Sequence, residues 1–158
     1  MKIIIKDCNL NICRELDKWL ACEDIVNHAM FDQTFTEEYN YYQNNKLDEI
    51  VYQKVIFIDD ILIGYVVLMY YVEHGKYEVS FNPFIINPNY QNKGYGKMLL
   101  KYIIDNIELI VDGKVDYLVA SISIQNMISI RLFESLKFIK IGESADLTYI
   151  YYKLKNDS

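Results

Sequence analysis

The stretch Gln91-Asn92-Lys93-Gly94-Tyr95-Gly96-Lys97 joins a predicted strand to the start of a predicted helix. Unpaired amide groups and the helix dipole favour an anion at such a helix N-terminus. Glycines at 94 and 96 would let the backbone approach a phosphate closely, and Lys93 and Lys97 add positive charge. The stretch therefore predicts a phosphate-binding loop, although glycine-rich turns before helices also occur with no ligand.

Three predicted strands precede this loop, over residues 50–58, 62–72 and 77–86. The separators between them are short and polar or contain glycine, which predicts antiparallel hairpins. Asn82-Pro83 interrupts the third strand. Because proline cannot donate a hydrogen bond to a central ladder, we expect a bulge or a splayed strand at this point.

The N-terminal part predicts a strand over 2–6 and helices over 13–20 and 24–42. Aromatic residues recur at helical spacing in the second helix, at Phe31, Phe35, Tyr39 and Tyr42. This spacing favours a packed face over an aromatic box for a ligand.

An amphipathic helix follows the loop and ends at Gly113; its apolar face holds Leu100, Ile103, Ile104, Ile107 and Val111. A strand over 117–122, a helix from about Asn126 and strands over 138–141 and 147–154 complete the chain. The order of elements predicts one α/β domain over residues 1–158, with a mixed sheet.

Composition narrows the classes of partner. The formal net charge is -6 and the isoelectric point is near 4.9. Nucleic-acid binding is disfavoured, because neutralising phosphates needs clustered Lys and Arg, whereas cationic ligands are mildly favoured. No apolar run suits a signal peptide or a membrane span, so we expect a soluble, cytoplasmic protein with no membrane partner.

The cysteines are Cys8, Cys13 and Cys22, an odd number that fits neither a disulfide framework nor a CxxC metal site. Reduced structural thiols are therefore expected, and no metal site is predicted.

Two common phosphate-binding motifs do not fit the loop. A P-loop needs a Ser or Thr after its Gly-Lys pair, and Met98 follows Lys97. A dinucleotide fingerprint needs a third glycine, but Leu99 lies three residues after Gly96.

The loop instead resembles the GNAT family of acyl-CoA-dependent N-acetyltransferases, whose motif runs Arg/Gln-x-x-Gly-x-Gly/Ala at the start of the central helix. Gln91, Gly94 and Gly96 match it. A second family signature, Asn-x-x-Ala-x-x-Leu-Tyr-Glu-x-Leu-Gly-Phe, is met by Asn126, Leu132, Glu134, Leu136 and Phe138, whereas Ser129, Phe133 and Lys137 depart from it. The resemblance covers nearly the whole chain.

The resemblance implies a GNAT-type fold: a mixed, mostly antiparallel sheet with a splayed central strand, flanked by about four helices. It also implies acetyl-CoA as cofactor and a possible homodimer. The implied cofactor-binding residues are Phe84, Ile85 and Ile86 for pantetheine, Gln91, Asn92, Lys93, Gly94, Tyr95, Gly96 and Lys97 for the pyrophosphate loop, and Asn126 for the cofactor arm. The alternative for Asn126 is that it only caps its helix.

The implied reaction is direct attack of a primary amine on the thioester, which needs a base and an oxyanion donor. The amide near Ile86 is the expected donor, and Glu78 is the candidate base, two residues before Ser80, where the family often carries glutamate. Glu78 can equally be a structural strand residue. Other candidates are Glu73, His74, Glu37 and Glu38.

Phe133 stands where many family members place the tyrosine that protonates the departing thiolate. Phenylalanine cannot donate a proton, but a thiol is a tolerable leaving group unaided. The leading hypothesis is acetylation of a small amine such as a polyamine, an aminoglycoside or an amino-acid derivative. Alternatives are acetylation of a protein lysine or N-terminus, and a non-catalytic acyl-CoA-binding module.

Overall fold

A computed structural model describes residues 1–30 and 32–157, with the His28 side chain excepted. One mixed sheet of seven strands runs in the order β1-β2-β3-β4-β5-β7-β6. The strands are β1 (Ile3–Asp7), β2 (Ile50–Ile58), β3 (Ile61–Glu73), β4 (Lys76–Ile86), β5 (Tyr117–Ser123), β6 (Ile139–Glu143) and β7 (Tyr149–Lys155). All neighbours pair antiparallel except β4 and β5, which are parallel. The predicted mixed, mostly antiparallel sheet is confirmed.

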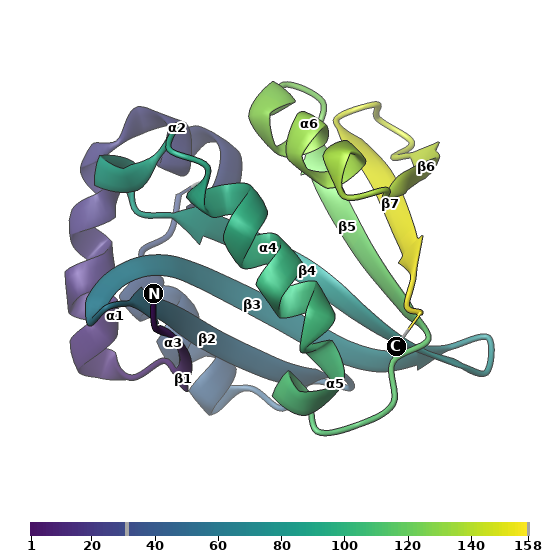
Figure 1. Ribbon diagram of the computed structural model, residues 1–158, viewed down its shortest axis with the longest axis horizontal. Helices are drawn as coiled ribbons and strands as arrows, with labels where there is room; N and C mark the ends of the chain where they lie inside the picture. Colours follow the sequence, from purple (N-terminus) through teal and green to yellow (C-terminus); the bar gives the residue numbers. More distant parts are fainter. Residues whose placement is uncertain (31, 158) are drawn as a thin grey trace.

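Helices cover both faces of this sheet (Figure 1). They are α1 (Leu10–Asp17), η1 (Lys18–Ala21), α2 (Glu23–Ile25), η2 (Val26–Met30), α3 (Phe35–Asn44), η3 (Pro88–Tyr90), α4 (Tyr95–Asp105), α5 (Ile107–Ile110) and α6 (Met127–Ser135). One face packs on the segment from α1 to α3, with Leu16, Trp19 and Phe35 in its core. The other packs on α4, α5 and α6, with Leu99, Ile103 and Phe133 in its core. No helix in the described ranges is both long and apolar enough to span a membrane.

The continuous helix predicted over 24–42 is wrong. The chain forms α2 and a single π-helical turn, and then restarts at Phe35. Thr34 and Glu37 form a reciprocal capping box at the start of α3, and a carboxylate oxygen of Asp17 accepts from the Phe35 amide at 2.7 Å. The side chains of Thr34 and Asp17 thus accept from amides in the first turn of α3, which in a continuous helix would donate to carbonyls of the preceding turn.

Phe35 and the other members of the predicted aromatic stripe can now be placed. Phe35 is fully buried and meets Trp19 and Tyr65 edge-on, as expected for a packed face. Tyr39 and Tyr42 pack partly buried at the border of the same core. Phe31 lies outside the described residues.

The helix after the loop is also divided, because α4 ends at Asp105 and α5 begins at Ile107. Their apolar residues keep one buried face, including Leu100, Ile103 and Ile107. The division does not change which face of the sheet they cover.

The bulge predicted at Asn82-Pro83 is present. Val66 pairs with Phe84 and Leu68 with Phe81, so Val67 alone lies opposite Asn82-Pro83. Beyond this point β4 also loses its other neighbour, because pairing with β5 stops at Phe81 while β4 continues to Ile86. The ribbons of β4 and β5 diverge from there (Figure 1). The predicted splay is therefore part of the fold.

Candidate functional site

The loop before α4 presents unpaired backbone amides. Asn92 and Gly94 have positive φ values of 62° and 84°, and Gly94 is the N-cap of α4 with no side-chain cap. The first amides of a helix have no intrahelical partner, and here no side chain of the described residues replaces one at the cap. Such a turn can hold an anion on its N–H groups and on the positive end of the helix dipole.

Two lysines add positive charge beside these amides. Both Lys93 and Lys97 are exposed, and neither forms a salt bridge within residues 1–30 and 32–157. The Nζ of Lys93 lies 5.5 Å from the ring centroid of Tyr90, whereas Lys97 lines the neighbouring cavity. Lys97 is therefore the better placed of the two for an anion in that cavity.

The free edge of β4 faces the gap. The amide of Asn87 donates to the carbonyl of Ile63 on β3 at 2.7 Å, so the Ile86 carbonyl in the same peptide points away from β3. Gln91 Nε2 donates to this carbonyl at 3.2 Å. Because backbone directions alternate along a strand, Phe84 shares the orientation of Ile86. Polar groups of both residues are thus available to an extended ligand.

A cavity of about 460 Å³ joins the loop to this edge. Its lining comes from four segments: Asp24, Ile25 and Ala29; Phe84, Ile85 and Ile86; Tyr90, Gln91, Asn92, Gly94, Gly96 and Lys97; and Gln125, Asn126, Met127, Ile128, Ser129 and Leu132. At Gly96 an added Cβ would stand 3.6 Å from Leu132 and 3.8 Å from Ile86. A larger side chain there would project into the space between α4, α6 and β4.

Asn126 both caps α6 and lines the cavity. Its Oδ1 accepts from the Ser129 amide at 3.2 Å, so Asn126 does cap its helix. Its Nδ2 has no hydrogen-bond partner among the residues the structure describes, which leaves a donor at the cavity wall. Next to it, Met127 and Ile128 are 48% and 68% exposed, an unusual amount of apolar surface for one helical turn.

Nine of the eleven predicted cofactor residues line this cavity. Lys93 and Tyr95 do not. The Tyr95 ring meets Tyr90 edge-on at 5.9 Å and packs against the core under α4. The side chains of both residues therefore lie outside the lining of the cavity.

Sequence reasoning missed the wall contributed by the segment from α2 to η2, namely Asp24, Ile25 and Ala29. Nothing in the local sequence marks these residues. It also missed Met127 and Ile128, although two large apolar residues just after a helix cap are a signal that could have been used.

Glu78, the candidate base, lies apart from this lining. It is only 5% exposed, and both of its carboxylate oxygens are engaged: Lys153 Nζ lies 2.9 Å from Oε2, and the Tyr71 hydroxyl donates to Oε1 at 3.3 Å. Its place on β4 is within the stretch paired with β5, before the gap opens. The carboxylate therefore has a structural partner in addition to any chemical role.

The other candidate bases also have local partners. His74 Nε2 lies 3.2 Å from a carboxylate oxygen of Glu73, and both side chains are exposed at the turn between β3 and β4. Glu37 belongs to the capping box of α3. None of these residues lines the cavity.

Glu38, a residue of α3, has a buried carboxylate. The Tyr65 hydroxyl donates to it, Gln33 Nε2 donates to it at 3.1 Å, and Gln53 Nε2 donates to the Tyr65 oxygen at 3.0 Å. Burial raises the pKa of Glu38, which the two hydrogen bonds only partly oppose. Burial and the Glu38 charge also raise the pKa of Tyr65. The network ties α3 to β2 and β3 and stands apart from the cavity.

Phe133 lies in the core rather than at the cavity wall. Its ring meets Phe138 at 4.9 Å and Phe81 at 5.9 Å between centroids, and Phe81 is the last residue of β4 paired with β5. The side chain thus closes the inner end of the gap with an apolar surface.

Solved structures share the fold of this chain. The fold is similar to spermidine N-acetyltransferase from Vibrio cholerae in complex with CoA and spermine, with a TM-score of 0.78 and 16% identity over 98% of this chain and 95% of that chain. It is similar to the yncA protein from Salmonella typhimurium with its cofactor acetyl-CoA, with a TM-score of 0.71 and 20% identity over 100% and 96%. It is also similar to the ribosomal-protein-S18-alanine N-acetyltransferase from Escherichia coli, with a TM-score of 0.65 and 17% identity over 99% and 96%.

No curated protein matches this chain by sequence. The model of the acetyltransferase (GNAT) family matches residues 15–138, a stretch that includes the loop, the free edge of β4 and all of α6. Because the match spans well over half of the 158 residues, the chain belongs to the GNAT family of acetyltransferases.

Proposed function

We propose that this protein transfers the acetyl group of acetyl-CoA to a primary amine of a small molecule. The observation that carries the proposal is the uncapped start of α4, whose amides and Lys97 face a cavity continuous with the free edge of β4. The helix N-terminus is complementary to the anionic diphosphate of the coenzyme, and the strand edge is complementary to its extended pantetheine arm. The residues present therefore fit acetyl-CoA.

The proposed binding roles follow from position. The amides from Asn92 to Lys97 would hold the diphosphate, and the outward backbone groups of Phe84 and Ile86 would pair with the pantetheine arm. The free Nδ2 of Asn126 would donate to the same arm from α6. When bound, the coenzyme would supply the acetyl group as a thioester.

The proposed chemical roles are fewer. The N–H of Ile86, fixed at the strand edge, would donate to the oxygen on which negative charge develops. Glu78 remains the proposed base, although its ion pair with Lys153 must loosen or relay through water for it to accept a proton. No tyrosine is assigned the role of general acid, and Phe133 cannot fill it.

A small cationic amine is the acceptor we favour. The net charge of -6 attracts cations, and Asp24 places a carboxylate in the cavity lining. The similar Vibrio cholerae enzyme holds spermine, which supports an amine of this class. The similarity to the alanine N-acetyltransferase of Escherichia coli supports a protein N-terminus as the second candidate.

Two measurements test the proposal. Calorimetry should detect coenzyme A binding, and chromatographic detection of acetylated product should show transfer to at least one amine in a panel of polyamines, aminoglycosides and amino-acid derivatives. An extended peptide with an N-terminal alanine belongs in the same panel, and faster turnover of it would favour the second candidate. Absence of coenzyme binding by folded protein would overturn the proposal, and binding without any transfer would favour a non-catalytic module.

A further inference from the structure

Two cysteines from different elements lie in contact beneath α3. Cys8 directly follows β1, Cys13 lies in α1, and their Sγ atoms are 3.2 Å apart. The contact is held by the backbone: the Cys8 amide donates to the Gln53 carbonyl and the Cys13 amide to the Asn9 carbonyl, each at 2.9 Å. A disulfide bond is about 2.05 Å long, so closing it requires the sulfurs to approach by only about 1 Å.

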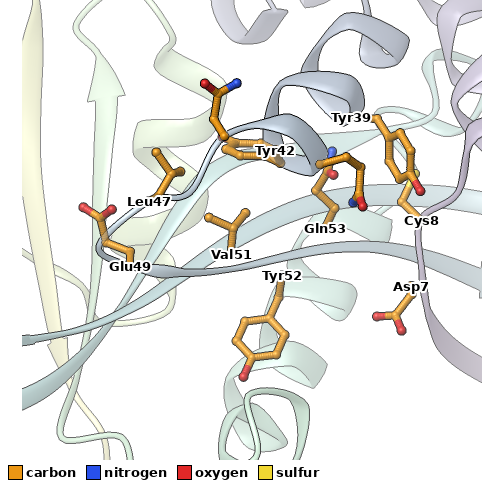
Figure 2. A pocket seen from close by; sticks show the side chains of 11 residues that line it. Asp7, Cys8, Tyr39, Tyr42, Leu47, Glu49, Val51, Tyr52 and Gln53 are labelled. Carbon is orange, nitrogen blue, oxygen red and sulfur yellow. The ribbon is translucent and has the colours of Figure 1, made fainter.

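The two thiols differ in access and in acidity. Cys13 is fully buried. Cys8 is 8% exposed and lines a second cavity, of about 360 Å³, between α3 and the start of β2; Figure 2 shows its side chain there beside Tyr39 and Gln53. The hydrogen bond with Cys13 lowers the pKa of Cys8, and the same bond raises the pKa of Cys13. Because Cys8 lines the cavity and Cys13 does not, a reagent in the cavity would meet the Cys8 sulfur first, with Cys13 behind it.

We propose that Cys8 and Cys13 form a redox-active dithiol that a hydroperoxide oxidises to an intramolecular disulfide. In the first step the Cys8 sulfur attacks the peroxide O–O bond, which breaks to give Cys8 sulfenic acid and releases the alcohol, or water from hydrogen peroxide. In the second step the Cys13 sulfur attacks the Cys8 sulfur, the S–O bond breaks and water leaves. Overall, two thiols and one peroxide give one disulfide, one alcohol and one water. This modification site is independent of the acetyl-transfer proposal.

Hydrogen peroxide added to the reduced, folded protein tests the site. The intact mass should fall by about 2 Da, for the loss of two hydrogens, and return with dithiothreitol. Peptide mapping without reductant should find Cys8 joined to Cys13, in the wild type and in the matched control Cys22→Ser. A mass gain of oxygen atoms without the loss of two hydrogens, or a disulfide that includes Cys22, would overturn the proposal.

A second variant tests the order of the steps. In Cys13→Ser the sulfenic acid on Cys8 should persist and be captured by dimedone, whereas Cys8→Ser should show no capture at Cys13. Capture at Cys13 in folded Cys8→Ser would overturn the assignment of Cys8 as the nucleophile. Because the wild-type peptide map does not depend on the variants, the test stands even where a variant fails to fold.

Discussion

Lys153 on β7 and Glu78 on β4 form an ion pair of 2.9 Å that reaches across β5. The Glu78 side chain is 6% exposed and that of Lys153 is 32% exposed, and Lys153 Nζ also lies 4.3 Å from the ring centroid of Tyr117 on β5. The pair lies where β4 and β5 are still hydrogen-bonded, before the strands part after Phe81. The ion pair therefore links β4 to β7 at the end where β4 and β5 are still paired. The proposed cofactor site lies beyond this end, where β4 and β5 separate.

The unequal burial of this pair predicts an unequal response to mutation. Lys153→Met would leave the Glu78 carboxylate buried without its cation and should lower the free energy of unfolding by about 2–3 kcal/mol. Glu78→Gln should cost only about 1 kcal/mol, because Lys153 can extend to solvent. Urea denaturation measures both, with Lys155→Met on the same strand as the control. Equal losses for the two variants would contradict the asymmetry.

Glu78→Gln also tests the proposed base. If Glu78 accepts the proton of the amine, kcat should fall by about 100-fold or more while the dissociation constant of coenzyme A is unchanged. Lys153→Met keeps the carboxylate and should retain much more of the activity. The pH profile of kcat/KM, together with coenzyme binding by calorimetry, provides the readout. If Glu78→Gln lowers kcat only slightly, and Lys153→Met lowers it by the same factor, Glu78 is not the base and its role is structural.

Gly96→Val should weaken coenzyme binding by about tenfold or more, because the new side chain would enter the space between Ile86 and Leu132. Gly96→Ala is the matched control: its single added carbon meets those neighbours at ordinary contact distance and should change affinity little. Calorimetry on both variants gives the comparison. Equal affinity in the two proteins would place the ligand elsewhere.

The buried Glu38 predicts a pH dependence of stability with a definite sign. Because its pKa in the folded protein is raised above the ordinary value of 4.5, the folded state binds a proton more tightly than the unfolded state. The contribution of Glu38 to stability is therefore greatest below pH 4.5 and is lost as the pH rises to the folded pKa. Glu38→Gln should remove this decline.

Unfolding of the wild type and of Glu38→Gln over a pH series is the measurement. The stability of the variant relative to the wild type should grow as the pH increases through that window. Curves that stay parallel would show that Glu38 titrates alike in the folded and unfolded chains.

Local sequence signals account for some of the differences between prediction and structure. Hydrophobic periodicity alone predicts one helix over 24–42. Thr34 and Glu37, however, have the spacing of a capping box, and this signal marks the start of α3 within that range. The partner that makes the restart favourable, Asp17, comes from α1 and can be identified only once the chain is folded. Likewise, Glu78 is correctly placed on a strand, but its partner Lys153 is 75 residues away along the chain.

Features that depend on neighbouring residues could be predicted from the sequence: the strands, the glycine loop before α4, the proline that breaks the ladder of β4, and through these the family. Backbone geometry and the missing proline N–H act locally, so these features can be read along the chain. Contacts between side chains far apart in the sequence became known only from the folded structure. The wall at Asp24 and the pairing of Glu78 with Lys153 arise because packing two layers onto one sheet brings distant segments together, and no local pattern specifies those distances.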